Sequence, residues 1–140
     1  MDKTDRTVAA PARIDIRVVS TYLPDHSRPE QQQYVFAYTI TISNRADSTV
    51  QLLSRHWVIT DADGEVEEVR GEGVVGEQPV IAPGESFRYT SGATIGTPVG
   101  CMEGSYTMVR CDDAGRAPLQ GQRFDVPIPA FSLHTPTALH

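Results

Sequence analysis

The sequence contains few cysteines. Only Cys101 and Cys111 occur in 140 residues, and they form neither a CxxC pair nor a cysteine and histidine pattern with the spacing of zinc ligands. A structural zinc site of the usual four-ligand kind is therefore excluded. The first 13 residues lack the apolar core of a signal peptide. Without such an export signal, we expect both thiols to be reduced.

Long apolar runs are also missing. No segment approaches the ~18 consecutive apolar residues that suggest a membrane-spanning helix. The 12 basic and 18 acidic residues give a net charge of -6 at pH 7. A negative chain has no general attraction for polyanions. We therefore expect a cytoplasmic protein that neither inserts into a membrane nor binds nucleic acid.

No stretch shows the periodicity of an amphipathic helix of useful length. Apolar residues instead recur at every second position, most clearly in YVFAYTITISN at 34–44. Strands are expected at 14–19, 34–44, 50–60, 65–70, 86–95, 105–111 and 122–131. Seven short strands with turns between them predict a single all-β domain, an antiparallel β-sandwich of the immunoglobulin or fibronectin type III kind. A barrel is the alternative topology.

Turn residues set the expected connections. Asp63 and Gly64 suit a two-residue type I′ hairpin, which would place Trp57 opposite Arg70 and His56 opposite Gly71. On this register Trp57 is the centre of the core and the Arg70 stem covers its indole.

Other segments lack strand patterning or carry prolines. The segment Pro83-Gly84 predicts a type II turn. Residues 23–32 and 96–104 are expected to be connections, and 112–116 a turn. Pro127 and Pro129 place the last strand at a sheet edge, where it and the first strand could pair in a homodimer.

A GxGxxG pattern occurs at Gly71, Gly73 and Gly76. In dinucleotide-binding folds this pattern opens a helix, but Pro79 and Pro83 exclude a helix here, and no GK[ST] follows as in a phosphate-binding Walker loop. We expect the glycines mainly to allow positive φ and close packing. The alternative is an anion-binding nest of glycine amides, supported by nearby arginines.

Metal and catalytic patterns are incomplete. Asp61, Asp63 and Glu65 resemble the start of a calcium loop, but Val66 stands where that loop needs glycine. His56 has no convergent set of further ligands, and no serine lies in a GxSxG elbow. We therefore expect a protein that is not an enzyme and has no cofactor. The candidate loop for an anion, another ligand or a partner comprises Arg55, His56, Arg70, Gly71, Gly73 and Gly76.

Four segments together resemble the bacterial ApaG family. They are YVFAYTITISN at 34–44, LLSRHWVITDADG at 52–64, VRGEGVVGEQPVIAPGESFRYTSG at 69–92 and PVGCMEGSYTM at 98–108. The resemblance implies a fibronectin type III-like sandwich, a tendency to dimerise, and a link to cobalt resistance and magnesium efflux (the CorD phenotype). Related domains in eukaryotic F-box proteins are interpreted as protein-binding modules. The family's glycine motif has been regarded as a possible pyrophosphate site.

These observations predict three segments and one main function. Residues 1–12 are expected to form a tail, 13–133 an ApaG domain and 134–140 a C-terminal tail. The expected function is noncatalytic binding of a protein partner, which the sequence does not identify. The alternative is a ligand-dependent protein that binds pyrophosphate, a nucleotide, or magnesium or cobalt through the glycine loop.

Overall fold

The structure is a computed structural model that describes residues 13–112, 116 and 122–137. The predicted tail at 1–12 and the centre of the predicted turn at 112–116 lie outside these residues. The regular elements are β1 (Ile14–Tyr22), η1 (Pro24–His26), η2 (Pro29–Gln31), β2 (Tyr34–Asn44), β3 (Val50–Asp61), β4 (Val66–Glu72), β5 (Val80–Ile81), β6 (Ser86–Ile95), β7 (Val99–Arg110) and β8 (Arg123–His134). The two short 3-10 turns lie in the connection that the sequence predicts at 23–32.

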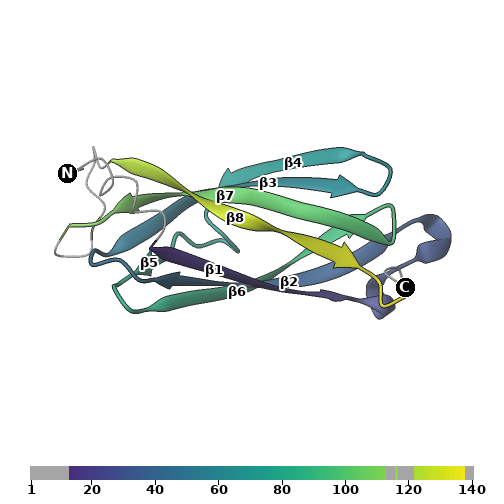
Figure 1. Ribbon diagram of the computed structural model, residues 1–140, viewed down its shortest axis with the longest axis horizontal. Coiled ribbons are helices and arrows are strands. Elements are labelled where there is room, and N and C mark those ends of the chain that lie inside the picture. Colours follow the sequence, from purple (N-terminus) through teal and green to yellow (C-terminus); the bar gives the residue numbers. More distant parts are fainter. Residues whose placement is uncertain (1–12, 113–115, 117–121, 138–140) are drawn as a thin grey trace, which may run out of the picture.

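Two antiparallel sheets form the molecule. One has the strand order β1-β2-β6, and the other has the order β4-β3-β7-β8 with β5 beside β3. Figure 1 shows the two sheets as stacked layers. The predicted β-sandwich is therefore confirmed, and the alternative barrel is not formed. The first and last strands are edge strands, as the sequence predicts.

The core lies between the sheets and follows from the two-residue period of the strands. In β2, Phe36, Tyr38, Ile40 and Ile42 are buried, whereas the residues between them are partly exposed. Trp57 of β3 is only 2% exposed and packs in the same core. The prediction that Trp57 is a central core residue is confirmed.

The predicted register between β3 and β4 is wrong by one residue. His56 pairs with Arg70 and Trp57 with Val69, so Arg70 is not the partner of the indole. The turn has three residues, because the amide of Asp61 donates to the Glu65 carbonyl, and only Gly64 has a positive φ. A three-residue loop with glycine in the left-handed region gives this register, and a shift of one residue moves each side chain to the other face.

The prediction of a connection at 96–104 is also wrong, because β7 begins at Val99. The glycines in this segment serve close strand packing. A Cβ added at Gly100 would lie 2.9 Å from the Thr60 carbonyl oxygen, and one at Gly104 would lie 2.0 Å from the His56 carbonyl oxygen. Glycine inside a strand therefore marks a close backbone approach here, rather than a turn.

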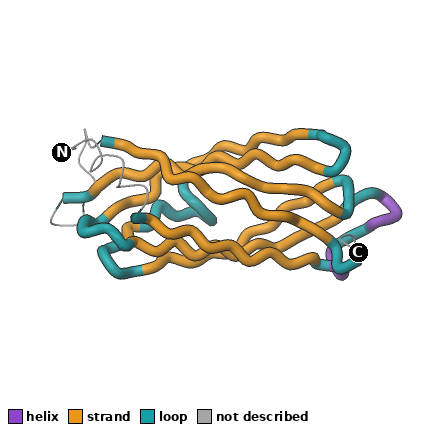
Figure 2. Tube along the Cα trace, in the orientation of Figure 1, coloured by secondary structure: helices purple, strands orange, loops and turns teal. Residues whose placement is uncertain are grey.

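The two long sides of the sandwich differ. On one side, β1 contacts β8. The edges on the other side are β4 and β6, and the chain after β4 turns back into the space between the layers there (Figure 2). The end of this segment is anchored by Val74, which is 1% exposed. The glycine motif therefore lies at the open side of the sandwich.

Candidate functional site

Residues 74–77 form a tight hairpin within the glycine motif. The amide of Val74 donates to the Glu77 carbonyl at 2.8 Å, and the amide of Glu77 donates back at 2.9 Å. The two central residues, Val75 and Gly76, have φ values of +43° and +80°. Two positive φ angles in succession define a type I′ turn. We call residues 74–77 the glycine hairpin.

Gly73 enters this hairpin under tight steric constraint. Its φ is +65°, and a Cβ added there would lie 2.2 Å from the Glu77 carbonyl oxygen. Its amide donates to the Leu53 carbonyl at 2.8 Å. The amides of Gly73, Val74 and Glu77 are thus all used inside the protein. An anion nest made from these three amides would have to break existing hydrogen bonds.

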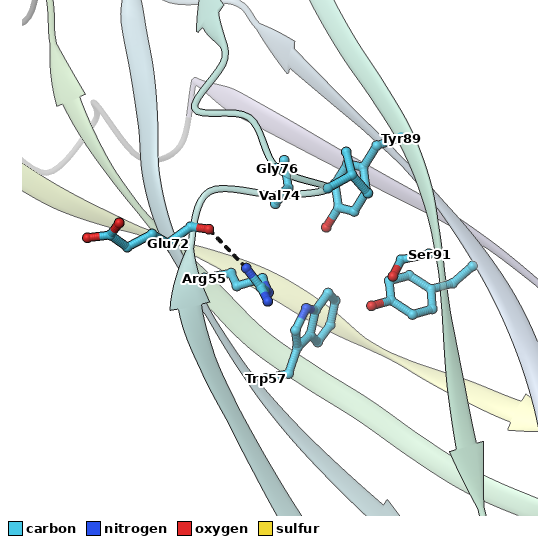
Figure 3. Close-up of a pocket in the computed structure, with 9 residues that line it drawn as sticks. Arg55, Trp57, Glu72, Val74, Gly76, Tyr89 and Ser91 are labelled. Carbon is cyan, nitrogen blue, oxygen red and sulfur yellow. Dashed lines mark hydrogen bonds between the residues drawn. The ribbon is translucent and has the colours of Figure 1, made fainter.

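A cavity of about 300 Å³ opens beside the glycine hairpin. Its walls come from β2, β3, β4, β6 and the hairpin, and its lining residues are Tyr38, Arg55, Trp57, Glu72, Val74, Val75, Gly76, Tyr89 and Ser91. Figure 3 shows the Arg55 guanidinium beside the indole of Trp57, while the Glu72 carboxylate points away from the other side chains drawn. We call this space the Arg55 cavity.

A β-bulge places Arg55 in the cavity. The pairing of β3 with β7 shifts between Leu52 and Ser54, so Arg55 and Trp57 point to the same face as the buried Leu52. In a regular strand Leu52 and Trp57 would point to opposite faces, because they are five positions apart. The bulge therefore turns a charged side chain toward the interior.

Backbone groups fix the position of the Arg55 guanidinium. Its Nη1 donates to the carbonyl of Glu72 at 3.1 Å and to the carbonyl of Gly73 at 2.9 Å. The guanidinium also lies over Gly71, where an added Cβ would be 2.8 Å from Cζ. Glycine at position 71 thus leaves room for the Arg55 guanidinium.

Three buried tyrosines surround the cation. Tyr38, Tyr89 and Tyr106 are 6%, 7% and 0% exposed, and the hydroxyls of Tyr89 and Tyr106 are hydrogen bonded at 2.5 Å. Burial raises the pKa of each of the three phenols, and the charge of Arg55 acts in the opposite direction. The phenols of Tyr89 and Tyr106 therefore stay neutral in the folded protein at pH values well above the ordinary pKa of tyrosine.

These pKa shifts predict a loss of stability at alkaline pH. A group whose pKa is raised by folding contributes its full stability below the unfolded pKa, which is about 10 for tyrosine. Above that pH the unfolded chain loses protons that the folded chain retains. Tyr89 and Tyr106, whose pKa values folding raises furthest, should then each remove about 1.4 kcal/mol of unfolding free energy per pH unit. Urea unfolding between pH 8 and 11.5 measures this slope.

The matched variant is Tyr106→Phe, which removes one of the three titrating groups. Its stability should fall less steeply above pH 10, by about 1.4 kcal/mol per pH unit. An equal slope in the two proteins would contradict the assignment of Tyr106 as a neutral buried phenol.

The structure separates the predicted site residues into two groups. Arg55 and Gly76 line the Arg55 cavity, and Gly71 and Gly73 contact or hydrogen bond Arg55. His56 and Arg70 are paired on the opposite face of the sheet.

On that face, the Glu68 carboxylate interacts with both His56 and Arg70. The carboxylate is 2.8 Å from His56 Nε2 and 3.3 Å from Arg70 Nη2. The hydrogen bond with His56 lowers the pKa of the Glu68 carboxyl. This cluster is exposed, so it contributes little to stability.

Seven of the nine lining residues were not among the predicted site residues, and three of these seven lie on β2 and β6. Tyr38 and Tyr89 are inward residues of β2 and β6, and Ser91 follows on the same face of β6. Tyr38 has the alternating pattern of a core residue. An inward-facing strand position gives the same pattern whether its side chain packs in the core or lines a cavity. These three residues are recognised as cavity residues only because they line the same space as Arg55.

Other site types find no support within the described part of the chain. No group of three or more His, Cys, Asp or Glu residues there is placed to hold a metal ion. Both cysteines are free, and burial raises the pKa of each thiol. Among the same residues no helix has the length and apolar character to cross a membrane.

Known proteins resemble the chain over most of its length. The profile of the ApaG domain matches residues 24–110. The chain is 55% identical over 128 residues to the ApaG protein of Azoarcus sp. (strain BH72), covering 91% of this chain and 94% of that protein. It is 53% identical over 128 residues to the ApaG protein of Pseudomonas paraeruginosa, covering 91% and 95%. A crystal structure of an ApaA protein from Bordetella pertussis matches with a TM-score of 0.80 at 47% identity, covering 89% and 95%.

Proposed function

The chain belongs to the ApaG family, and on that basis we propose that it is a noncatalytic binding module that docks another protein at the open side of the sandwich. The docking surface comprises the glycine hairpin and the two flanking edges, β4 and β6. The feature that carries the proposal is the conformation of Val75.

Val75 is held in an unfavourable conformation at an exposed site. Its φ of +43° is rare for a β-branched residue, and strain of this kind costs about 1–3 kcal/mol. The side chain is nevertheless 52% exposed, so burial in this chain does not offset the strain. Strained backbone of this kind clusters at functional sites. We infer that the partner supplies the missing contact.

The surroundings of Val75 suit a protein partner. Val80 is 47% exposed a few residues further along the chain. The adjacent β4 is an edge strand, whose outer amides and carbonyls have no neighbouring strand in the sheet. An edge strand with exposed apolar side chains beside it can bind an extended peptide segment as an additional strand. In this proposal, the link to cobalt resistance and magnesium efflux acts through the bound partner.

The test compares proteins captured from cells by wild type and by Val75→Gly. Glycine accepts φ near +43° without strain, so this variant should be at least as stable as wild type. It lacks the apolar Val75 side chain, however. The captured amount of one or a few proteins should therefore fall by about tenfold, as expected when an apolar side chain buried in an interface is removed. The control is Val19→Gly, because Val19 is 68% exposed on β1, away from this surface. Equal capture by all three proteins would refute the proposal.

The alternative is a protein that depends on pyrophosphate, a nucleotide or a divalent cation bound at the glycine loop. A ligand that binds only the folded state raises the melting temperature. We expect no rise with pyrophosphate, nucleotides, Mg²⁺ or Co²⁺. A rise that is lost in Gly76→Ala would favour this alternative over protein docking.

A further inference from the structure

The Arg55 guanidinium is an inward-facing cation that has no anionic partner among the described residues. None of the ion pairs among the described residues includes Arg55. The side chain is half-buried and lines a cavity. Removing a charge from water is costly unless an opposite charge and hydrogen bonds replace the water. The cavity therefore favours the entry of an anion.

The hydrogen bonds of Arg55 leave one edge of its guanidinium without a partner among the described residues. Nη1 donates to the Glu72 and Gly73 carbonyls. No hydrogen bond from Nε or Nη2 is formed with any described residue. These two nitrogens form one planar edge of the guanidinium, and that edge matches the two oxygens of a carboxylate in a bidentate pair.

The remaining cavity walls fit an anion with a single charge. Arg55 is the one cationic side chain among the lining residues, and the hydroxyls of Tyr38, Tyr89 and Ser91 are neutral. The acidic Glu72 also contributes to the lining. A pyrophosphate would bring several negative charges to one cation, and the excess charge would be buried without compensation. A carboxylate brings one.

We propose that the Arg55 cavity is a receptor for a single carboxylate, supplied by an Asp or Glu side chain of the docked partner. The inference rests on the proposed function, because the cavity shares Val75 and Gly76 with the glycine hairpin that forms the docking surface. Val75 contacts the apolar part of the partner, and Arg55 pairs with an acidic residue beside it. The partner segment that docks here thus carries an acidic residue next to an apolar one.

The test is an NMR titration of the full chain at constant ionic strength. The probe is N-acetylglutamate α-amide, and its matched neutral control is the corresponding glutamine compound. The carboxylate should shift the Arg55 Nε–H resonance and the amides of Val75 and Gly76 in a saturable way. The glutamine compound should not. An Arg55 resonance that does not respond to the carboxylate overturns the proposal.

Two variants test whether carboxylate binding depends on the planar Nε–Nη2 edge of Arg55. Arg55→Lys keeps the charge but loses the planar edge, and should weaken carboxylate binding by about tenfold. Gly71→Ala keeps the arginine but places a methyl group 2.8 Å from Cζ, and should also weaken binding. Arg17→Lys on β1, outside the docking surface, is the control and should bind as wild type does. Undiminished binding in both Arg55→Lys and Gly71→Ala overturns the proposal.

Three further outcomes bear on this inference and on the proposed function from which it starts. Tighter binding of inorganic pyrophosphate than of the carboxylate probe at Arg55 would overturn the assignment of a singly charged ligand. Capture that depends on Val75, together with no carboxylate response at Arg55, would leave the proposed function standing and remove this inference. A carboxylate response without Val75-dependent capture would instead remove the proposed function and assign the cavity to a free carboxylate.

Discussion

Trp57→Ala should lower the free energy of unfolding by about 3–5 kcal/mol. Trp57 is 2% exposed, and its ring lies 5.4 Å from Tyr38, 6.5 Å from Tyr106 and 5.9 Å from Phe131 in edge-on arrangements. The substitution removes the largest core side chain and these ring contacts, which together link both sheets. A single domain is typically stable by only about 5–15 kcal/mol, so the variant should be close to unfolding.

Urea unfolding followed by circular dichroism measures this effect, because the variant has no tryptophan fluorescence. The control is Val58→Ala on the outer face of the same strand, where the side chain is partly exposed. Its loss should stay below about 1 kcal/mol. A cooperative Trp57→Ala variant with nearly wild-type stability would contradict the central position of the indole.

Gly104→Ala should destabilise the protein by about 3 kcal/mol or more, above the usual range for adding one methyl group to a packed core. The added Cβ would lie 2.0 Å from the His56 carbonyl oxygen and 3.2 Å from the Trp57 Cα. Both atoms belong to the backbone of the neighbouring β3, so a rotamer change cannot relieve the clash. The central pairing of β3 with β7 must open instead.

Gly92→Ala provides the matched control for this clash. Gly92 also lies inside a strand without positive φ, but a Cβ there would be 3.4 Å from the Phe36 carbonyl oxygen. Its change in stability should stay within about 1 kcal/mol, because alanine also reduces the freedom of the unfolded chain. Similar losses for Gly92→Ala and Gly104→Ala would show that close strand approach is not the reason for glycine at position 104.

Local patterns in the sequence are sufficient to predict most strands and the turn at Pro83-Gly84. The alternation in β2 predicts its buried face, because a strand exposes successive residues to opposite sides. Pro83 and Gly84 predict a type II turn, and the amide of Glu85 donates to the Ala82 carbonyl across it with Gly84 at φ +83°. Each of these features depends on a few neighbouring residues.

Register and bulges depend on more distant residues and were missed. Asp63-Gly64 is compatible with a two-residue or a three-residue hairpin, and the choice shifts β4 by one position. The sequence did contain a signal for the bulge in β3. Leu52 and Trp57 are both suited to the core but are separated by an odd number of positions, so both can point inward only if the strand is irregular. Applying that rule would have placed Arg55 inside.

Pro127 and Pro129 have a consequence for the behaviour of the protein at high concentration. Both lie in β8, an edge strand that would otherwise offer a row of amides to another chain. Proline has no amide hydrogen, so β8 lacks two of the donors that a growing intermolecular sheet needs. Aggregation through this edge is discouraged while β4 and β6 keep their donors. The β8 edge is thereby less able to extend into an intermolecular sheet, whereas the edges beside the glycine hairpin stay available for a partner.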